Sequence, residues 1–468
     1  MTFLALPTAP SRDRMVTGRA TPLDGRVADV LNDFTEWLAR YGETSRDHQT
    51  FFAGATGQAA KALYYRHKLL GTVAVAPMVF LEAFLPSARR LFHQPTRFPI
   101  ADAHYAMGFA FLFQVTNDEA HLRRAIHFLE ELKKSRSPGF AEYCWGYPYD
   151  WVTRNGTIKE RTPLITTTPY CYEAFLQVYR ILESEDGGRR TEDTHEGSED
   201  LLEQYKQIIQ SIARHAFRDI KDFSSSENAS SCSYTPSDKG GVINAAAYRA
   251  FLLTSASQVF SNDDYWLTAE RNLNFVLEAQ NPDGSWFYAV DGVRDFVDHY
   301  HTCFVMKALA KVHSLTGHAA TLDALRKGVS YYLNNLFDTD DLPKPFSRAP
   351  RLTVYKRELY DCAECINLCL LLQGRFPQLE TTLETVVAGI LKDWIKPDGS
   401  FRSRRLHLGW DNGPMHRWGQ AQMFRSLAFY LRETRSEDGG PRADDGRQRS
   451  EGRRQSSDCG AVEIAERS

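Results

Sequence analysis

Residues 280–307 read Gln280-Asn-Pro-Asp-Gly-Ser-Trp-Phe-Tyr-Ala-Val-Asp-Gly-Val-Arg-Asp-Phe-Val-Asp-His-Tyr-His-Thr-Cys-Phe-Val-Met-Lys307, and this stretch decides the fold. Pro-Asp-Gly favours a turn, and the aromatic run after it favours a short strand. A second Asp-Gly turn follows, and then the apolar spacing of a helix. Weaker relatives of this junction recur along the chain. We therefore predict helical hairpins joined by such junctions at one rim.

Working outward, amphipathic helical patterns occur in pairs, and the pairs recur at a fixed spacing. First helices are expected to start near residues 242, 299, 357 and 414, in steps of 57, 58 and 57 residues. Self-similarity at a fixed period is typical of a repeat architecture. The expected hairpins join 101–116 with 119–135, 168–183 with 198–216, 242–259 with 262–279, 299–315 with 319–336, and 357–374 with 377–394.

Further helical patterns occur near the N-terminus, at about Arg26–Arg40 and Gly57–Phe92, and a last helix is expected at about Pro414–Arg432. If the last helix pairs with the N-terminal helical region, six hairpins close into an all-α (α/α)6 toroid with short β-hairpin or loop junctions at one rim. Closure removes the exposed ends that an open solenoid must cap. We expect the toroid to span residues 24–433. Polar, charge-dense composition predicts a flexible N-terminus at 1–23, a disordered insertion at 183–200 and a disordered tail at 434–468.

Composition narrows the function. The chain has 468 residues and a net charge of −3, so nothing indicates nucleic-acid binding. Its eight cysteines form no evident disulfide framework, which predicts a reducing, cytoplasmic location. The most apolar run, Leu69–Leu85, is interrupted by Pro77 and Glu82 and is short for a membrane-spanning helix of ~20 residues. We expect a buried helix there, with contact to a membrane surface as the alternative.

The predicted junctions are rich in Trp, Tyr, Asp, His and Arg, a mixture that suits a carbohydrate. Sugar faces stack on aromatic rings, their hydroxyls bind planar polar groups, and a sugar carboxylate pairs with Arg or Lys. Carboxylates and His supply acid–base chemistry. Candidate catalytic residues are Asp150, Asp298, His301 and Glu364, and Asp361 is a further candidate. Candidate substrate-binding residues are Trp145, Tyr149, Trp151, Arg154, Tyr170, Trp286, Tyr288, His299, Lys344, Arg357, Tyr360, Trp410, Arg417, Trp418 and Gln420.

Each candidate has a purely structural alternative. Asp298 stands where a helix N-cap belongs, the tryptophans suit a core, and Arg417 could anchor a loop. Cys362-x-x-Cys365-x-x-x-Cys369 has metal-like spacing, but it lies in an apolar helical pattern without a clear fourth ligand. We expect a buried helix face there, and neither a metal nor a cofactor.

Two motifs favour a rival function. Asp338-Thr-Asp-Asp341 matches the acid motif of class II terpene cyclases, and Gln280–Trp286 matches their Gln-x-x-x-Gly-x-Trp repeat. Those enzymes are also helical toroids. However, Leu-Pro-Lys-Pro follows Asp341 directly and indicates a loop, and the second motif is convincing only once. Terpenoid cyclisation at Asp340 is therefore the weakest alternative.

Five segments resemble the six-hairpin glycosidase-like proteins associated with bacterial surface polysaccharides. They are Trp145–Trp151, Thr162–Tyr170, Asp283–Gly292, Asp298–Thr302 and Arg417–Met423. The resemblance covers roughly residues 60–432. It implies an (α/α)6 toroid and a role in making or modifying exopolysaccharide, with membrane-surface assembly machinery as a further partner. The wider superfamily contains uronyl hydrolases, sugar 2-epimerases and polysaccharide lyases, so fold alone leaves the reaction open.

The resulting hypothesis is an enzyme that hydrolyses, eliminates or epimerises an acidic oligo- or polysaccharide in the toroid cavity. Asp150 and Asp298 would transfer protons with His301 assisting, and Arg154 or Arg417 would hold the acidic group. A non-catalytic glycan-binding or assembly protein is the main alternative. The sugar and its linkage stay open.

Overall fold

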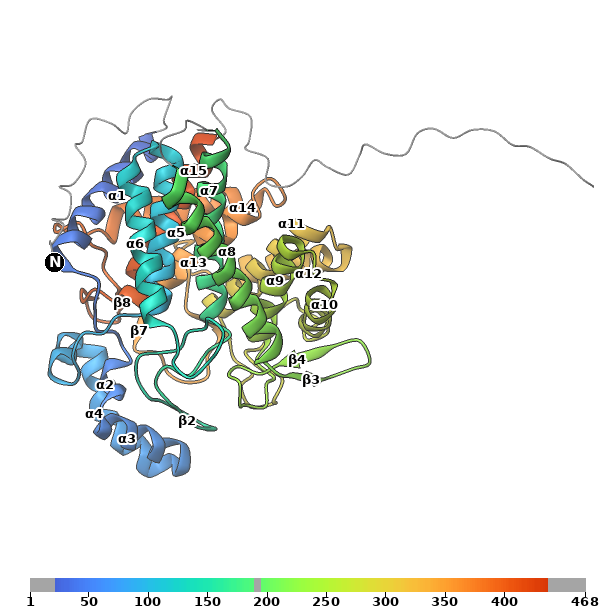
Figure 1. Cartoon of the computed structure of the whole chain (residues 1–468). Coiled ribbons are helices and arrows are strands. Elements are labelled where there is room, and N and C mark those ends of the chain that lie inside the picture. Colours follow the sequence, from blue (N-terminus) through green and yellow to red (C-terminus); the bar gives the residue numbers. More distant parts are fainter. Residues whose placement is uncertain (1–21, 189–194, 437–468) are drawn as a thin grey trace, which may run out of the picture.

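The computed structural model describes residues 22–188 and 195–436 of the chain. Twelve of its helices form two concentric rings, and each of these helices is labelled in Figure 1. The inner ring consists of α5 (Pro99–Thr116), α7 (Thr168–Gly188), α9 (Ile243–Phe260), α11 (His299–Thr316), α13 (Leu359–Leu371) and α15 (Ala421–Ser436). The outer ring consists of α6 (Glu119–Ser135), α8 (His195–Arg218), α10 (Asp263–Glu278), α12 (Ala319–Asn335), α14 (Gln378–Asp393) and α1 (Pro22–Tyr41).

The inner ring is closed. Each inner helix packs against the next, and α15 contacts both α13 and α5. Each of the first five also packs against the outer helix that follows it in its hairpin, and α15 pairs with α1 from the other end of the chain. The structure therefore confirms the predicted (α/α)6 toroid, including the pairing of its first and last helices.

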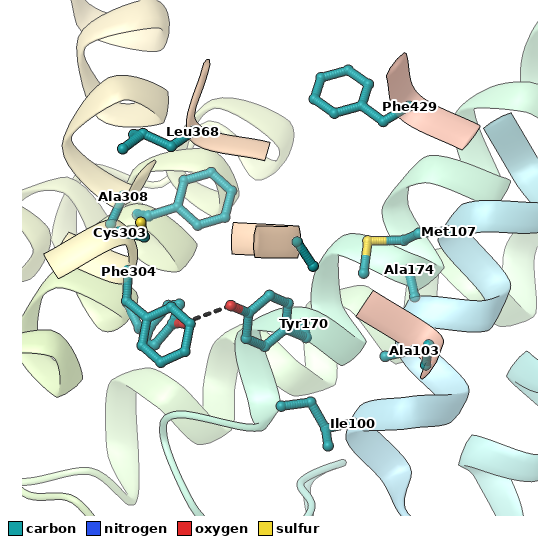
Figure 2. Close-up of a cluster of buried hydrophobic side chains, with 14 of the residues drawn as sticks. Ile100, Ala103, Met107, Tyr170, Ala174, Cys303, Phe304, Ala308, Leu368 and Phe429 are labelled. Atoms are coloured by element: carbon teal, nitrogen blue, oxygen red, sulfur yellow. Dashed lines mark hydrogen bonds between the residues drawn. The ribbon is translucent and has the colours of Figure 1, made fainter. Parts of the chain in front are cut away.

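Burial separates the two rings. In α5 every residue from Pro99 to Phe113 is buried, whereas α6 buries one stripe that includes Leu122, Phe128 and Leu132. A helix that is apolar all round belongs inside a fold, and an amphipathic helix belongs outside. Figure 2 shows inner-ring side chains, among them Met107, gathered at the centre of the ring.

Short strands occupy the junctions, as expected, and all are two to four residues long. The pairs are β1 (Trp151–Thr153) with β2 (Gly156–Ile158), β3 (Asp222–Ser224) with β4 (Ser230–Cys232), and β5 (Val297–Asp298) with β6 (Phe346–Arg348). A three-stranded sheet joins β7 (Tyr355–Glu358), β8 (Arg404–Leu406) and β9 (Trp410–Asp411). The strand expected after Trp286 is reduced to one bridge between Ala289 and Val242.

The stretch 280–307 is anchored by Trp286, which is 3% exposed. Its Nε1 donates to the Val276 carbonyl over 2.9 Å, and its ring lies against Gly328 of α12. A Cβ at residue 328 would lie 2.8 Å from the Trp286 ring. The junction therefore locks α10 to α12.

An additional hairpin lies beside the ring (Figure 1). It comprises α2 (Thr50–Ala53), α3 (Ala55–Arg66), α4 (Lys68–Phe84) and the 3₁₀ turn η2 (Pro86–Leu91). It has a separate small core of Phe51, Ala60 and Met78. The expectation of a buried helix at 69–85 is wrong, because the apolar side chains of α4 face outward, with Leu69 84% exposed.

Two predicted segments lie almost wholly on residues that the structure leaves undescribed, and a third lies there in part. Residues 1–21 and 437–468 lie outside the described ranges, as do 189–194 of the predicted insertion. The flanks of that insertion, to Gly188 and from His195, are helical. Within 22–188 and 195–436, no helix has the length and apolarity needed to cross a membrane.

Candidate active site

A cavity of about 50 Å³ lies where the N-terminal ends of the inner helices meet the junctions. Aromatic side chains dominate its wall, and six of them are tyrosines. Thirteen residues line it: Ile100, Tyr147, Thr166, Tyr170, Tyr234, Asn244, Tyr248, Tyr300, His301, Phe304, Tyr360, Arg417 and Trp418.

A kinked turn at His416–Gln420, directly before α15, places Arg417 and Trp418 in the wall. The Gln420 amide donates to the Met415 carbonyl, five residues back, over 3.1 Å. The backbone angles of Trp418 and Gly419 within this turn are non-helical, so the chain kinks there before α15 begins. The Trp418 ring meets Tyr300 and Tyr360 edge-on, with ring centroids 5.6 and 4.8 Å apart.

Arg417 is held by Asp47, whose Oδ2 lies 2.7 Å from both its Nε and its Nη2. Its guanidinium also lies over the Tyr147 ring, 4.6 Å from the centroid. Both residues of the ion pair are buried, and Asp47 raises the pKa of Arg417 against the opposing effect of burial. Arg417 is therefore a rigid, permanently charged donor in the wall.

His301 forms a dyad with Asp298 at the start of α11. The Asp298 Oδ1 accepts the His301 backbone amide over 2.9 Å, and its Oδ2 lies 2.6 Å from His301 Nδ1. Asp298 is thus an N-cap and a partner of the imidazole at once. With an ionised Asp298, Nδ1 carries the proton and Nε2 is left as an acceptor. The side chain of His301 is 21% exposed and lines the cavity, whereas that of Asp298 is 1% exposed.

A second acidic group lies close behind the wall. Asp361 follows Tyr360 on α13, is fully buried, and neither carboxyl oxygen has a hydrogen-bond partner. Burial first, and then the neighbouring carboxylates Glu358 and Asp298, raise the pKa of Asp361 well above its usual range. The surroundings of Asp361 therefore disfavour the charged form of its carboxyl group.

Tyr170 and Tyr248 form a hydroxyl pair in the cavity wall. Their oxygens lie 2.6 Å apart. Burial raises the pKa of both phenols well above 10. Both hydroxyls keep their protons at neutral pH, and one donates a hydrogen bond to the other.

Two further cations lie within electrostatic range of each other and of the cavity wall. Lys61 of α3, which is half-buried, interacts with the exposed Arg351 and with Arg417, which lines the cavity. Burial, followed by repulsion from these two arginines, lowers the pKa of Lys61 to about 8. An anion placed there would relieve this repulsion.

Five of the sequence-predicted residues line the cavity: Tyr170, His301, Tyr360, Arg417 and Trp418. Three others lie one contact behind it. Asp298 binds His301, the Tyr288 ring meets His301 edge-on at 4.6 Å, and the Tyr149 ring lies under Arg417. Trp151 packs on Tyr147 at the rim.

Two predicted catalytic carboxylates lie elsewhere. Asp150 pairs with Lys159 over 2.8 Å and accepts the Glu160 amide over 2.9 Å, so both of its oxygens hold the β1–β2 junction. Glu364 forms an ion pair with Lys307 and is fully buried between inner helices. Neither lines the cavity, because local partners already occupy them.

The other predicted binding residues also have contacts outside the cavity. Trp145 and Trp286 donate to the Leu132 and Val276 carbonyls in the core, and Trp410 packs on Trp394. His299 bridges the Leu336 carbonyl and the Tyr332 hydroxyl, and Gln420 bonds the Phe401 backbone. Arg357 binds Asp338 and Asp340, Arg154 lies in the exposed β1–β2 turn, and Lys344 lies in the α12–α13 connection.

Sequence reasoning missed much of the wall. Tyr147, Thr166, Tyr234 and Asn244 lie inside junctions that it selected, but no local signal separated them from their neighbours. Tyr248, Tyr300, Phe304 and Ile100 belong to inner-helix patterns that resemble core. Their shared property is position in the first turns of inner helices, a signal that the hairpin register could have supplied.

The rival motifs have structural roles. Arg357 bonds Asp338 over 3.0 Å and Asp340 over 2.7 Å, and both carboxylates are substantially exposed on a loop. An acid that protonates a hydrocarbon needs an enclosed apolar site, which this loop lacks. Cys362, Cys365 and Cys369 lie on α13 and are buried in the main core.

Several solved structures with the same architecture are carbohydrate-active enzymes. An unsaturated glucuronyl hydrolase specific for heparin is 9% identical, with a TM-score of 0.57, 89% of this chain covered and 98% of that one. Cellobiose 2-epimerase from Bacillus thermoamylovorans B4167 is 10% identical, with a TM-score of 0.51 and coverages of 72% and 88%.

The GH76A alpha-1,6-mannanase from Salegentibacter sp. HEL1_6 is 12% identical, with a TM-score of 0.50 and coverages of 88% and 99%. Neither a protein-family model nor a curated protein matches the chain. Likeness at these identities establishes the fold, which these enzymes of differing chemistry share.

Proposed function

We propose that the protein is an enzyme that moves a proton on a carbon atom of an acidic glycan, by epimerisation or elimination, with His301 as the base. The observation that carries this proposal is the Asp298–His301 dyad in an aromatic wall. Asp298 fixes Nδ1–H, so Nε2 is available as a proton acceptor. Tyr300 and Trp418 supply the rings on which a sugar face stacks.

The lining disfavours hydrolysis by paired carboxylates. That mechanism requires two carboxyl groups flanking the scissile bond. Among the residues that the structure describes, no carboxylate lines the cavity, since Asp298 and Asp361 both lie behind it. The tyrosine hydroxyls at Tyr170 and Tyr248 are the groups able to return a proton or stabilise a developing oxyanion.

The acidic character of the substrate rests on Arg417, Lys61 and Arg351. A carbon-bound proton next to a carboxylate becomes removable when cations neutralise the enediolate that forms. Asp47 offsets part of the charge of Arg417, so Lys61 and Arg351 contribute the remaining positive field.

Substrate entry requires a change of shape. Ligand sites typically enclose about 300–1,000 Å³, and this cavity encloses about 50 Å³. Trp418 and Tyr300 line it with their rings in contact, and both are less than fully buried. We expect these rings to move apart when a sugar binds.

The test is an NMR time course with uronate-containing oligosaccharides in heavy water. Deuterium at the carbon next to the carboxylate in an intact chain indicates epimerisation, and unsaturated-sugar signals indicate elimination. His301→Gln should reduce either rate by about 10²–10⁴. His407→Gln, at an exposed turn, is the matched control. New reducing ends without deuterium would refute the proposal in favour of hydrolysis, and saturable binding without product in favour of a binding protein.

A further inference from the structure

The α3–α4 hairpin exposes an unusually large apolar face. Sixteen large hydrophobic side chains of the described residues are exposed, and ten of them lie between Tyr65 and Phe92. On α4 the spacing of Leu69, Val73, Phe80 and Phe84 places them on one stripe. Their exposed fractions are 84, 74, 56 and 52%. From Leu69 to Phe84 the stripe is about 22 Å long.

The amphipathicity of α4 is inverted. A surface helix normally turns its charges outward and its apolar side chains inward. The one acidic residue of α4, Glu82, is instead 7% exposed and bonds Arg89 over 2.8 Å. Glu82 also pairs with Arg404 of β8, and Arg89 pairs with Asp411 of β9 over 2.7 Å. This buried network fixes the apolar stripe to face away from the ring.

The exposed charged side chains of residues 55–92 are all positive. Arg66, Lys68 and Arg90 are exposed at its ends, while Glu82 is the only acidic residue of 55–92 and is buried. Tyr64 and Tyr65 lie at the α3–α4 turn beside Lys68. Apolar residues flanked by Lys, Arg and Tyr are typical of helices that lie in the interface of an anionic bilayer. At 17 residues, α4 is too short to span one.

We propose that the outer face of α4 docks onto the surface of an anionic lipid bilayer, with its helix axis in the plane of the interface. The apolar stripe enters the headgroup–acyl boundary, and Arg66, Lys68 and Arg90 bind lipid phosphates. This inference does not depend on the proposed enzyme function. Because α3 also contacts β1 at the junction rim, docking would hold the mouth of the cavity near the membrane.

The experiment is vesicle sedimentation of the full chain. Vesicles contain phosphatidylcholine alone, or phosphatidylcholine and phosphatidylglycerol in a roughly three-to-one mixture that mimics an anionic leaflet. The protein should sediment with the anionic vesicles, and raised salt should release part of it. Arg66→Gln, Lys68→Gln and Arg90→Gln together should weaken partitioning about a hundredfold.

Two matched triple variants distinguish docking through the apolar stripe from nonspecific hydrophobic adsorption. Leu69→Ser, Val73→Ser and Phe80→Ser together should abolish sedimentation. Leu267→Ser, Leu352→Ser and Leu408→Ser together change equally exposed residues elsewhere and should leave it intact. Circular dichroism checks that both variants remain folded. Equal sedimentation of the two variants would overturn the proposal.

Sedimentation velocity without lipid tests the competing occupant, a second copy of the chain. A dimer that the stripe variant alone dissociates, together with no vesicle binding, would overturn the proposal and make this face a subunit interface. Turnover of a water-soluble oligosaccharide should be unchanged in the stripe variant, so failure here is distinct from failure of the enzyme proposal.

Discussion

Replacing Asp298 separates its two roles, because one oxygen caps α11 and the other holds His301. Asp298→Ala removes the cap, worth about 1 kcal/mol, and a bond to a charged acceptor, worth about 1.5–3 kcal/mol. We expect the free energy of unfolding to fall by roughly 2.5–4 kcal/mol. Asp298→Asn keeps an acceptor oxygen for the cap, so it should lose only about 1 kcal/mol.

The chemical effect of Asp298→Asn should be larger than its effect on stability. An amide facing His301 Nδ1 donates a hydrogen bond, which moves the imidazole proton to Nε2. His301 then faces the cavity as a donor and cannot accept a proton there. Long-range ¹H–¹⁵N NMR of labelled histidine should report the changed tautomer, with His301→Gln identifying the signal. Turnover should fall about 10²–10⁴-fold.

The control is Asp118→Ala, which removes a surface N-cap from α6 where Asp118 accepts the Ala120 amide over 2.9 Å. It should cost about 1 kcal/mol in urea unfolding and leave turnover unchanged. The reasoning is refuted if Asp298→Ala costs no more than Asp118→Ala. It is refuted equally if Asp298→Asn keeps both the native tautomer and full turnover.

Three further predictions test packing and charge. Gly328→Ala should lower the free energy of unfolding in urea by about 1–3 kcal/mol, because its Cβ would lie 2.8 Å from the hydrogen-bonded Trp286 ring. Gly25→Ala is the control and should not destabilise the protein, because the space around its Cβ is open. Burial raises the pKa of Glu43, but bonds and charges from His127, Arg97 and Arg124 outweigh it and lower that pKa to about 2. The stabilisation from Glu43 should therefore be fully present above pH 4.5 and should fade as the pH falls toward 2. Glu43→Gln should lower the free energy of unfolding by about 1–2 kcal/mol after solvent screening. In unfolding measured as a function of pH, this difference should shrink only below pH 4.5. Because the pKa of Lys61 is about 8, the affinity for an acidic oligosaccharide, measured by calorimetry, should fall as the pH rises through 8. Lys61→Met should lack this pH-dependent fall in affinity. A variant with the same pH profile as the wild type would contradict a role of Lys61 in binding the acidic group.

The ring was predictable because its signals are periodic. Repeated hairpins, and junctions such as 280–307, follow from local composition, and every expected hairpin occurs in the structure. The Asp298–His301 contact was also local, since an N-cap residue meets the third residue after it. Structural features that depend on residues close in sequence could therefore be predicted from the sequence.

The rest of the site depends on contacts between distant segments. Asp47 and Arg417 are 370 positions apart, and no pattern in the chain relates them. Asp150 was predicted to be catalytic, and no sequence pattern indicated that the β1–β2 hairpin would bring Lys159 to it. The stripe on α4 was misread because hydrophobicity predicts removal from water without specifying whether protein or another apolar phase provides it.

Closure of the ring has a consequence for synthesis of the chain on the ribosome. Tyr105 of α5 bonds His416 over 2.5 Å, and α15 fills the gap between α5 and α13. Until α15 emerges, the inner faces of α5 and α13 lack their partner and stay open to water. The nascent chain therefore exposes apolar surface to water through most of its elongation. Because exposed apolar surface makes folding intermediates prone to aggregation, we expect the nascent chain to bind chaperones. Its folding should finish in one late step that no earlier segment can complete.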